Sequence, residues 1–188
     1  MLWDFFQDGI KVFLLRFFPL QHYRYHWTTL FGVLLFLGIS TYLIFYIIIG
    51  IHPLIIGLCI FGQILRCIIL NETASKVLLI QKNLKLNLFS FIVLTEGLSL
   101  ILILFYIFPQ NEFIQTLGFT ISFWLYFIQI KGLQKYSQQP FLKILLAYLI
   151  YTLIFASIIL TVLYICQITG GISSEELEKI NLFFEKKP

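Results

Sequence analysis

The chain has 188 residues, of which 60% are hydrophobic, 18% aromatic and only 12% charged, and its formal net charge is +4. Soluble domains carry about twice that share of charged residues, and a chain of this size has too small an interior to hide so many apolar side chains. Several apolar runs reach the roughly 18 residues that cross ~30 Å of hydrocarbon as a helix. The composition therefore excludes a soluble globular domain and predicts an all-α membrane protein.

Residues 1–27 are predicted to form a cytoplasmic amphipathic segment. Pro19 closes its helix, which we expect over residues 2–18 and which would lie in the headgroup plane with its aromatic side chains in lipid. Helical spacing gives it a polar stripe of Asp4, Gln7, Asp8 and Lys11 and an apolar stripe of Trp3, Phe6, Ile10, Phe13 and Phe17. The following run "QHYRYHW" brings aromatic and basic residues to the membrane boundary.

Residues 28–166 are predicted to form a membrane domain of five transmembrane helices. The expected spans are 28–51, 54–70, 88–108, 113–130 and 141–166, and the second is short because the polar run "NETASKVLLIQKNLKLN" follows it. Lysine and arginine precede the first span and occupy the second and fourth connections, whereas the first and third connections have none. This alternation predicts a cytoplasmic N-terminus and an outer C-terminus.

Residues 167–188 are predicted to form a short amphipathic tail on the outer face. Ser173 and Glu176 have the spacing of a capping box after a Gly-Gly break. The apolar side of this expected surface helix consists of Leu177, Ile180, Phe183 and Phe184. Three lysines of this tail, accompanied by glutamates, are the one exception to the alternation of basic connections.

Residues 117–165 contain Gly132-Leu133, Tyr136-Ser137 and Ala147, and here the chain resembles the end of the Yip family of integral membrane proteins. In that family a fourth span ends in a Gly-Leu pair, and a short Ser/Gln/basic loop leads into an Ala-containing fifth span. The resemblance implies five spans and a partner-binding or membrane-organising role. The Asp-Leu-Tyr-Gly-Pro element, tied to small-GTPase and vesicle-traffic roles in eukaryotic members, is absent. The chain thus looks like the compact bacterial type, which implies the bacterial cytoplasmic (inner) membrane.

Glu96 is the main candidate functional residue. It lies about 12 Å into the third span, close to the middle of a ~30 Å hydrocarbon core, and ionisable groups at that depth are functional candidates. The candidate intramembrane polar cluster that we expect between the second and third spans consists of Glu96, Gln63, Arg66, Thr95 and Ser99. An ion relay would need further groups, for which Gln129 and Gln115 are available. Alternatively, Glu96 only joins helices through a hydrogen bond.

Arg66 is predicted to be a helix-end anchor. It stands about one turn, or ~6 Å, from the expected end of the second span at Leu70, a distance over which an arginine side chain can reach the headgroups. In the alternative interpretation, Arg66 reaches toward Glu96 inside the bundle.

Enzyme signatures such as HExxH, GxSxG and the P-loop do not occur in the sequence. His22 and His26 are four residues apart but lack a third metal ligand, and the cysteines Cys59, Cys67 and Cys166 have no metal or disulfide spacing. We therefore expect a non-enzymatic protein with no cofactor, metal or nucleic acid. Its expected partners are the lipid bilayer and a membrane protein or further copies of itself. The alternatives are a small transporter or channel subunit that uses Glu96, and, with less support, a membrane enzyme acting on lipid.

Overall fold

The computed structural model describes residues 2–50, 52–79, 88–102, 105, 112–171 and 173. Every regular element within these ranges is a helix, which confirms the all-α class. The order is α1 (Leu2–Phe13), the 3-10 helix η1 (Leu20–Tyr23), α2 (Trp27–Ile49), α3 (Pro53–Leu79), α4 (Phe89–Gly97), the 3-10 helix η2 (Leu98–Leu100), α6 (Glu112–Ser137) and α7 (Phe141–Ile168). Of the described helices, α3, α6 and α7 are long and apolar enough to cross a membrane, as expected of a membrane protein.

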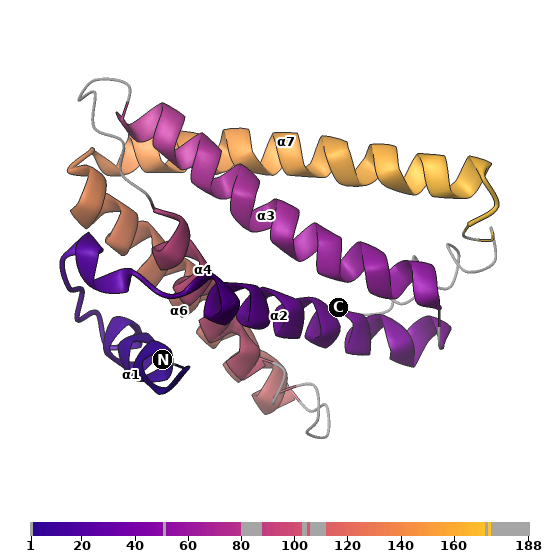
Figure 1. Ribbon diagram of the computed structural model, residues 1–188, viewed down its shortest axis with the longest axis horizontal. Coiled ribbons are helices and arrows are strands. Elements are labelled where there is room, and N and C mark those ends of the chain that lie inside the picture. The colour runs from indigo at the N-terminus through magenta and orange to yellow at the C-terminus, as the bar shows by residue number, and fades with distance from the viewer. Residues whose placement is uncertain are drawn as a thin grey trace.

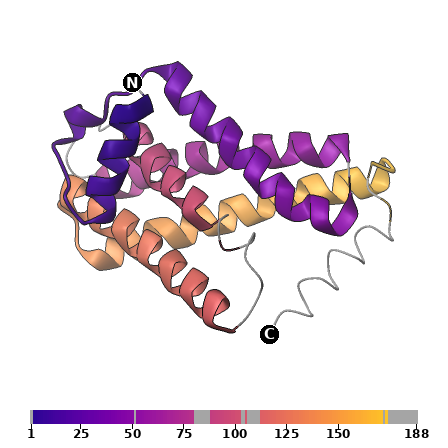
Figure 2. The same cartoon turned by 90° about the horizontal axis from the view of Figure 1, so that it is seen from below.

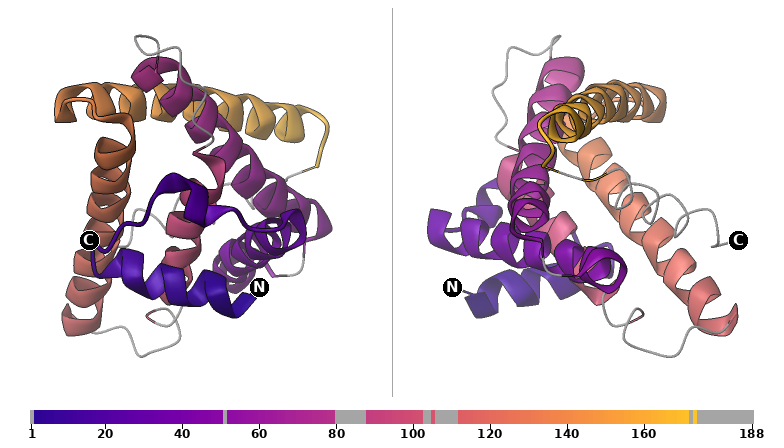
Figure 3. Two further views of the ribbon diagram at one scale, coloured as in Figure 1. Left: turned by 60° about the vertical axis from the view of Figure 1, so that its left-hand side comes forward. Right: turned by 90° about the vertical axis from the view of Figure 1, so that its right-hand side faces the viewer.

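Successive long helices run in opposite directions. α2 and α3 join at one end of the molecule, whereas α3 ends, α4 begins, α6 ends and α7 begins at the other end (Figure 1). α3 crosses between α2 and α7 and packs against both, and α4 lies among α1, α2, α3 and α6. α6 diverges from α7 away from their junction, which is clear from below (Figure 2) and along the bundle (Figure 3).

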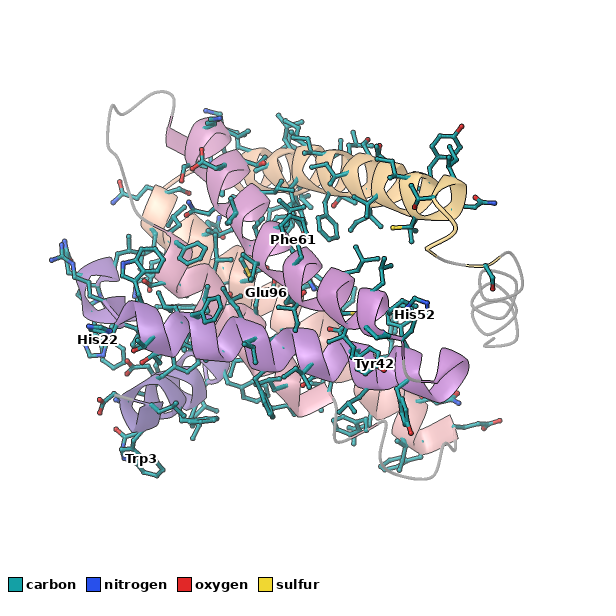
Figure 4. All side chains as sticks on the ribbon, turned by 45° about the vertical axis from the view of Figure 1, so that its right-hand side comes forward. Trp3, His22, Tyr42, His52, Phe61 and Glu96 are labelled. Atoms are coloured by element: carbon teal, nitrogen blue, oxygen red, sulfur yellow. The ribbon has the colours of Figure 1, made fainter. Side chains whose placement is uncertain are left out.

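The turn between α2 and α3 is as tight as the sequence predicts. Gly50 takes a φ of 83°, a conformation that favours glycine. The hydroxyl of Tyr42 donates to the Gly50 carbonyl at 3.2 Å and accepts from the His52 backbone N–H at 3.3 Å. Figure 4 shows Tyr42 and His52 close together at this end. In the middle of α2, a Cβ at Gly38 would lie 2.5 Å from the Ile60 Cα, so glycine lets α2 and α3 approach closely.

α3 is longer than predicted, because the helix continues past Leu70 through Leu79. The expectation that residues after Leu70 form a polar connection is wrong for residues 71–79. This stretch contains neither glycine nor proline, and Thr73, Ala74 and Leu78 are buried at helical spacing. Its exposed face carries the Glu72–Lys76 pair at 3.7 Å. A polar composition here reflects one solvated side of a helix rather than a loop.

α1 is shorter than predicted and ends at Phe13 rather than near Pro19. Leu15 takes a left-handed φ of 58°, and the Arg16 N–H returns to the Lys11 carbonyl at 2.8 Å, which closes the helix. Phe17 then lies beyond the helix, where its ring packs edge-on against Phe91 at 6.2 Å. The apolar stripe expected from residues 2–18 is therefore divided between the outer side of α1 and the protein core.

One closely packed part of the core lies where α4 meets α6 and the N-terminal segment. Phe91 is fully buried and packs against Tyr136 at 5.0 Å and Tyr23 at 5.7 Å. Gly132 faces this ring so closely that a Cβ there would overlap the Phe91 ring.

The predicted outer-face tail lies outside the described residues except for Ser173 and residues 167–171. Its expected capping partner Glu176 and apolar residues Leu177, Ile180, Phe183 and Phe184 are not among the residues described. Of the expected third span, residues 88–102 and 105 are described, and the chain is helical from Phe89 with a 3-10 turn at Leu98–Leu100.

Candidate functional site

An ion pair joins α3 to α4 inside the helix bundle. Arg66 Nη2 lies 3.1 Å from Glu96 Oε2, and the side chains are 27% and 5% exposed. Figure 4 shows Glu96 near the centre of the molecule. Arg66 stands thirteen residues from either end of α3, so it does not occupy the helix-end position that the sequence predicted. Its guanidinium instead supplies the counter-charge without which a buried carboxylate would be costly.

Gln129 on α6 and Tyr148 on α7 extend the ion pair into a network. The amide nitrogen of Gln129 donates to Thr95 Oγ1 at 2.8 Å and to Glu96 Oε1 at 3.3 Å. The hydroxyl of Tyr148 donates a short hydrogen bond to Gln129 Oε1. Both carboxylate oxygens of Glu96 therefore have partners, and one connected set of polar groups holds α3, α4, α6 and α7 together.

The other expected cluster residues lie around Glu96. Thr95 is buried and its hydroxyl also donates to the Ile92 carbonyl at 2.9 Å. Ser99 donates to the Glu96 carbonyl at 2.6 Å. Gln63 is buried on α3 and lines the same cavity as Glu96. Gln115 is exposed near the start of α6 and does not line that cavity.

A cavity of about 240 Å³ lies beside the ion pair. At the ~30 Å³ that one water molecule occupies in the liquid, it has room for roughly eight waters. Arg66 and Glu96 form part of its wall, as do Thr95 and Gln129. Its other polar lining residues are Ser40, Thr41, Gln63, Ser99, Ser122 and Tyr126.

The cavity extends from the ion pair toward one end of the bundle. Gln63 precedes Arg66 on α3, Ser99 and Leu102 follow Glu96, and Ser122, Leu125 and Tyr126 precede Gln129 on α6. Because these helices alternate in direction, these residues lie on the side of the ion pair away from the end where α3 and α6 finish (Figure 1). On the other side of the ion pair, the described residues include the fully buried apolar side chains of Cys67, Ile92, Leu133 and Ile144. A polar cavity on one side of the ion pair thus meets an apolar layer on the other.

Tyr148 and the hydroxyls of Ser40 and Ser122 were missed at the sequence level. A tyrosine in an apolar run resembles any core aromatic residue, although its hydroxyl needs a partner when it is buried. Serine gives no signal, because it can satisfy its own hydroxyl four residues back, as Ser40 does at the Phe36 carbonyl.

The two histidines weighed as metal ligands have other partners. His22 Nε2 lies 3.1 Å from Asp8 Oδ1, and His26 Nδ1 lies 3.1 Å from Thr28 Oγ1. Within the described ranges, no three potential metal ligands of the His, Cys, Asp and Glu types gather.

Comparison of the chain with known protein families, with proteins of curated function and with solved structures finds no match. The resemblance to the Yip family therefore stays a prediction that rests on residues 117–165. Within that stretch Gly132, Leu133, Ser137 and Ala147 are buried, and the Tyr136 hydroxyl donates to the Phe18 carbonyl at 2.8 Å. These residues pack α6, α7 and the N-terminal segment against one another.

Proposed function

We propose that this chain is a non-enzymatic, multi-pass membrane protein that carries protons or small ions through the polar cavity, as a small transporter or channel subunit. The observation that supports the proposal is the Arg66–Glu96 pair in the wall of that cavity. Charged groups within a membrane bundle usually face a water-filled path and mark the route of an ion or substrate.

The proposed architecture has five spans, with the N-terminus in the cytoplasm and the C-terminus outside. Three of the proposed crossings are α3, α6 and α7. The other two are α2 and the helix that begins at Phe89, whose described apolar parts are shorter than those of α3, α6 and α7. The connections with basic residues meet at the end where α3 and α6 finish, which favours that end as the cytoplasmic one. The cavity then opens toward the outer half of the membrane, which we propose is the bacterial cytoplasmic membrane.

Glu96 is the proposed proton site, because it is the one carboxylate among the described residues that line the cavity. A proton taken up at Oε2 neutralises Glu96 and leaves the Arg66 guanidinium without its counter-charge. A small anion in the cavity then replaces that charge, since an arginine binds oxyanions and carboxylates well. Proton uptake and anion binding would be coupled through this one ion pair.

Proteoliposomes test this proposal. The vesicles contain a pH-sensitive dye, and valinomycin with a potassium gradient drives protons inward. Wild-type protein should acidify the vesicles faster than lipid alone, Glu96→Gln should abolish the difference, and Glu72→Gln should behave as wild type, because Glu72 lies exposed on α3 and does not line the cavity. Wild-type vesicles that acidify no faster than protein-free vesicles would overturn the proposal.

The second candidate is a Yip-type component that binds a membrane-protein partner or its own copies. It is favoured by the fact that Arg66, Glu96 and Gln129 satisfy one another, as they would if they only held helices together. Affinity purification in mild detergent separates the candidates. A stoichiometric partner that both wild type and Glu96→Gln retain, with no proton flux in vesicles, would support this second role.

A further inference from the structure

A second polar groove lies between α1 and the start of α2, at the end of the molecule opposite His52. It encloses about 510 Å³. α1 contributes Asp4, Gln7, Asp8 and Lys11, which share one helical face. The opposite wall carries His22 and Arg24. Figure 4 shows His22 at this end of the bundle. The polar stripe predicted on α1 therefore lines a groove rather than an open surface.

Asp8 fixes the base of the groove. Its side chain is 6% exposed, although aspartate is almost never buried without a partner. The Tyr25 hydroxyl donates to Asp8 Oδ2 at 2.8 Å, while His22 lies 3.1 Å and Lys11 3.7 Å from Oδ1. Burial, and after it the neighbouring Asp8, raise the pKa of Tyr25, so the phenol keeps the proton that it donates. These contacts tie residues 22–25, which precede α2, to α1 and keep the groove formed.

The groove is lined by charged side chains of both signs. Lys11 and Arg24 provide two cationic groups, and Asp4 and Asp8 provide two anionic groups. Arg24 is exposed and lies on the wall of the groove opposite Asp4. A ligand with one negative and one positive group would find a complement for each.

The side of α1 next to the groove is apolar and exposed. The exposed fractions are 57% for Leu2, 70% for Trp3, 54% for Phe6 and 62% for Ile10. Trp3 points away from the bundle (Figure 4). In a membrane such a face lies in the lipid, with tryptophan at headgroup depth. Polar groove and lipid-facing surface thus adjoin along one helix, which suits a ligand with a polar head and apolar chains.

We propose that the groove binds the headgroup of a zwitterionic phospholipid of the phosphoethanolamine type. Arg24 and Lys11 hold the phosphate, because guanidinium and ammonium groups form charge-assisted hydrogen bonds with phosphate oxygens. Asp4 accepts hydrogen bonds from the ammonium group. The acyl chains lie along the exposed apolar side of α1, beside Trp3 and Ile10. This site is separate from the cavity at Glu96 and does not depend on ion transport.

The charge pattern predicts an order among phospholipids. Phosphocholine has the same net charge but no N–H donor for the Asp4 carboxylate, and phosphoglycerol has no cationic group. With phosphoglycerol the carboxylates of Asp4 and Asp8 would face a net negative headgroup, which weakens binding. The site should therefore hold phosphatidylethanolamine more tightly than phosphatidylcholine or phosphatidylglycerol of the same acyl chains.

Native mass spectrometry of the full chain in mild detergent tests the proposal, with dioleoyl forms of the three lipids titrated separately. Phosphatidylethanolamine should bind at the lowest concentration. Arg24→Gln removes a charge-assisted phosphate contact and should weaken its binding roughly tenfold or more, whereas Asp4→Asn should remove the preference over phosphatidylcholine. Arg16→Gln, which removes an exposed charge outside the groove, is the matched control and should bind as wild type. Thermal unfolding of each variant verifies its fold.

Three results would overturn the proposal. Equal binding of the three lipids would mean that the groove does not recognise the headgroup. An equal loss in Arg16→Gln and Arg24→Gln would mean that only general surface charge attracts lipid. Displacement of bound lipid by soluble O-phosphoethanolamine at a comparable concentration would mean that the ligand is a soluble phosphate ester and that the apolar side of α1 contributes nothing.

Discussion

Replacement of Glu96 by Gln leaves the Arg66 guanidinium without a counter-charge inside the bundle. The Glu96 side chain is 5% exposed and that of Arg66 is 27% exposed, so the charge left on Arg66 is only partly solvated. Removal of one partner from a buried ion pair costs about 3–5 kcal/mol, and the lower part of this range applies because a glutamine still bonds to Gln129. At ~2–4 °C per kcal/mol for a chain of this size, a loss of ~3 kcal/mol lowers the unfolding midpoint by roughly 6–12 °C.

Thermal unfolding in mild detergent, followed by circular dichroism, measures this loss in a double-mutant cycle. Arg66→Met combined with Glu96→Gln should recover most of the stability, because no unpaired charge stays in the bundle. The control is the Glu72–Lys76 ion pair on α3. Its side chains are 57% and 76% exposed, and Lys76 Nζ lies 3.7 Å from Glu72 Oε2. Removal of this pair should cost less than ~1 kcal/mol. Two results would refute the reasoning. The first is an unfolding midpoint of Glu96→Gln within about 2 °C of that of wild type. The second is a double variant whose loss of stability equals the sum of the losses of the two single variants.

Two further predictions follow from the packing and from the proposed topology. Gly132→Ala should destabilise by ~1–3 kcal/mol, since the added methyl overlaps the buried Phe91 ring. Gly62→Ala, with open space at its Cβ, should be neutral or stabilise by up to ~1 kcal/mol; thermal unfolding compares the two. In a cysteine-free background, Gln138→Cys should resist an impermeant external thiol reagent, whereas Thr169→Cys should react. Both positions are exposed, so the reverse pattern would invert the topology.

The burial of Glu96 among helices could be predicted from the sequence, whereas the position of Arg66 within its helix could not be judged from apolar runs alone. An interpretation of the polar stretch after Leu70 as a connection places Arg66 one turn from the end of its span. The signal against this was present in the sequence: residues 71–79 lack glycine and proline, and Glu72 and Lys76 have i,i+4 spacing. A helix that leaves the hydrocarbon becomes polar on its solvated side without ending there.

The partners of Glu96 on other helices lay beyond sequence analysis for a different reason. Gln129 is separated from Glu96 by 33 residues, and Tyr148 lies on the following helix. Whether they meet depends on how α6 and α7 rotate about their axes and cross α4. Lipid-exposed helices give little rotational signal, because side chains facing lipid and side chains facing protein are both apolar. Gln129 was recognised as polar at membrane depth, but its contacts needed the tertiary structure.

The packing around the ion pair bears on whether it serves stability or transport. A buried ion pair that only joined helices would gain nothing from an adjacent void, since hydrophobic side chains of similar volume are often as stabilising or more so, and empty space forfeits packing contacts. The bundle packs tightly at its other end, where Gly132 leaves room only for the Phe91 ring. Beside Arg66 and Glu96 it instead keeps about 240 Å³ open, lined with hydroxyl and amide groups. Room for water next to a charge is what the passage of an ion requires, and this favours transport over a purely structural role for the ion pair.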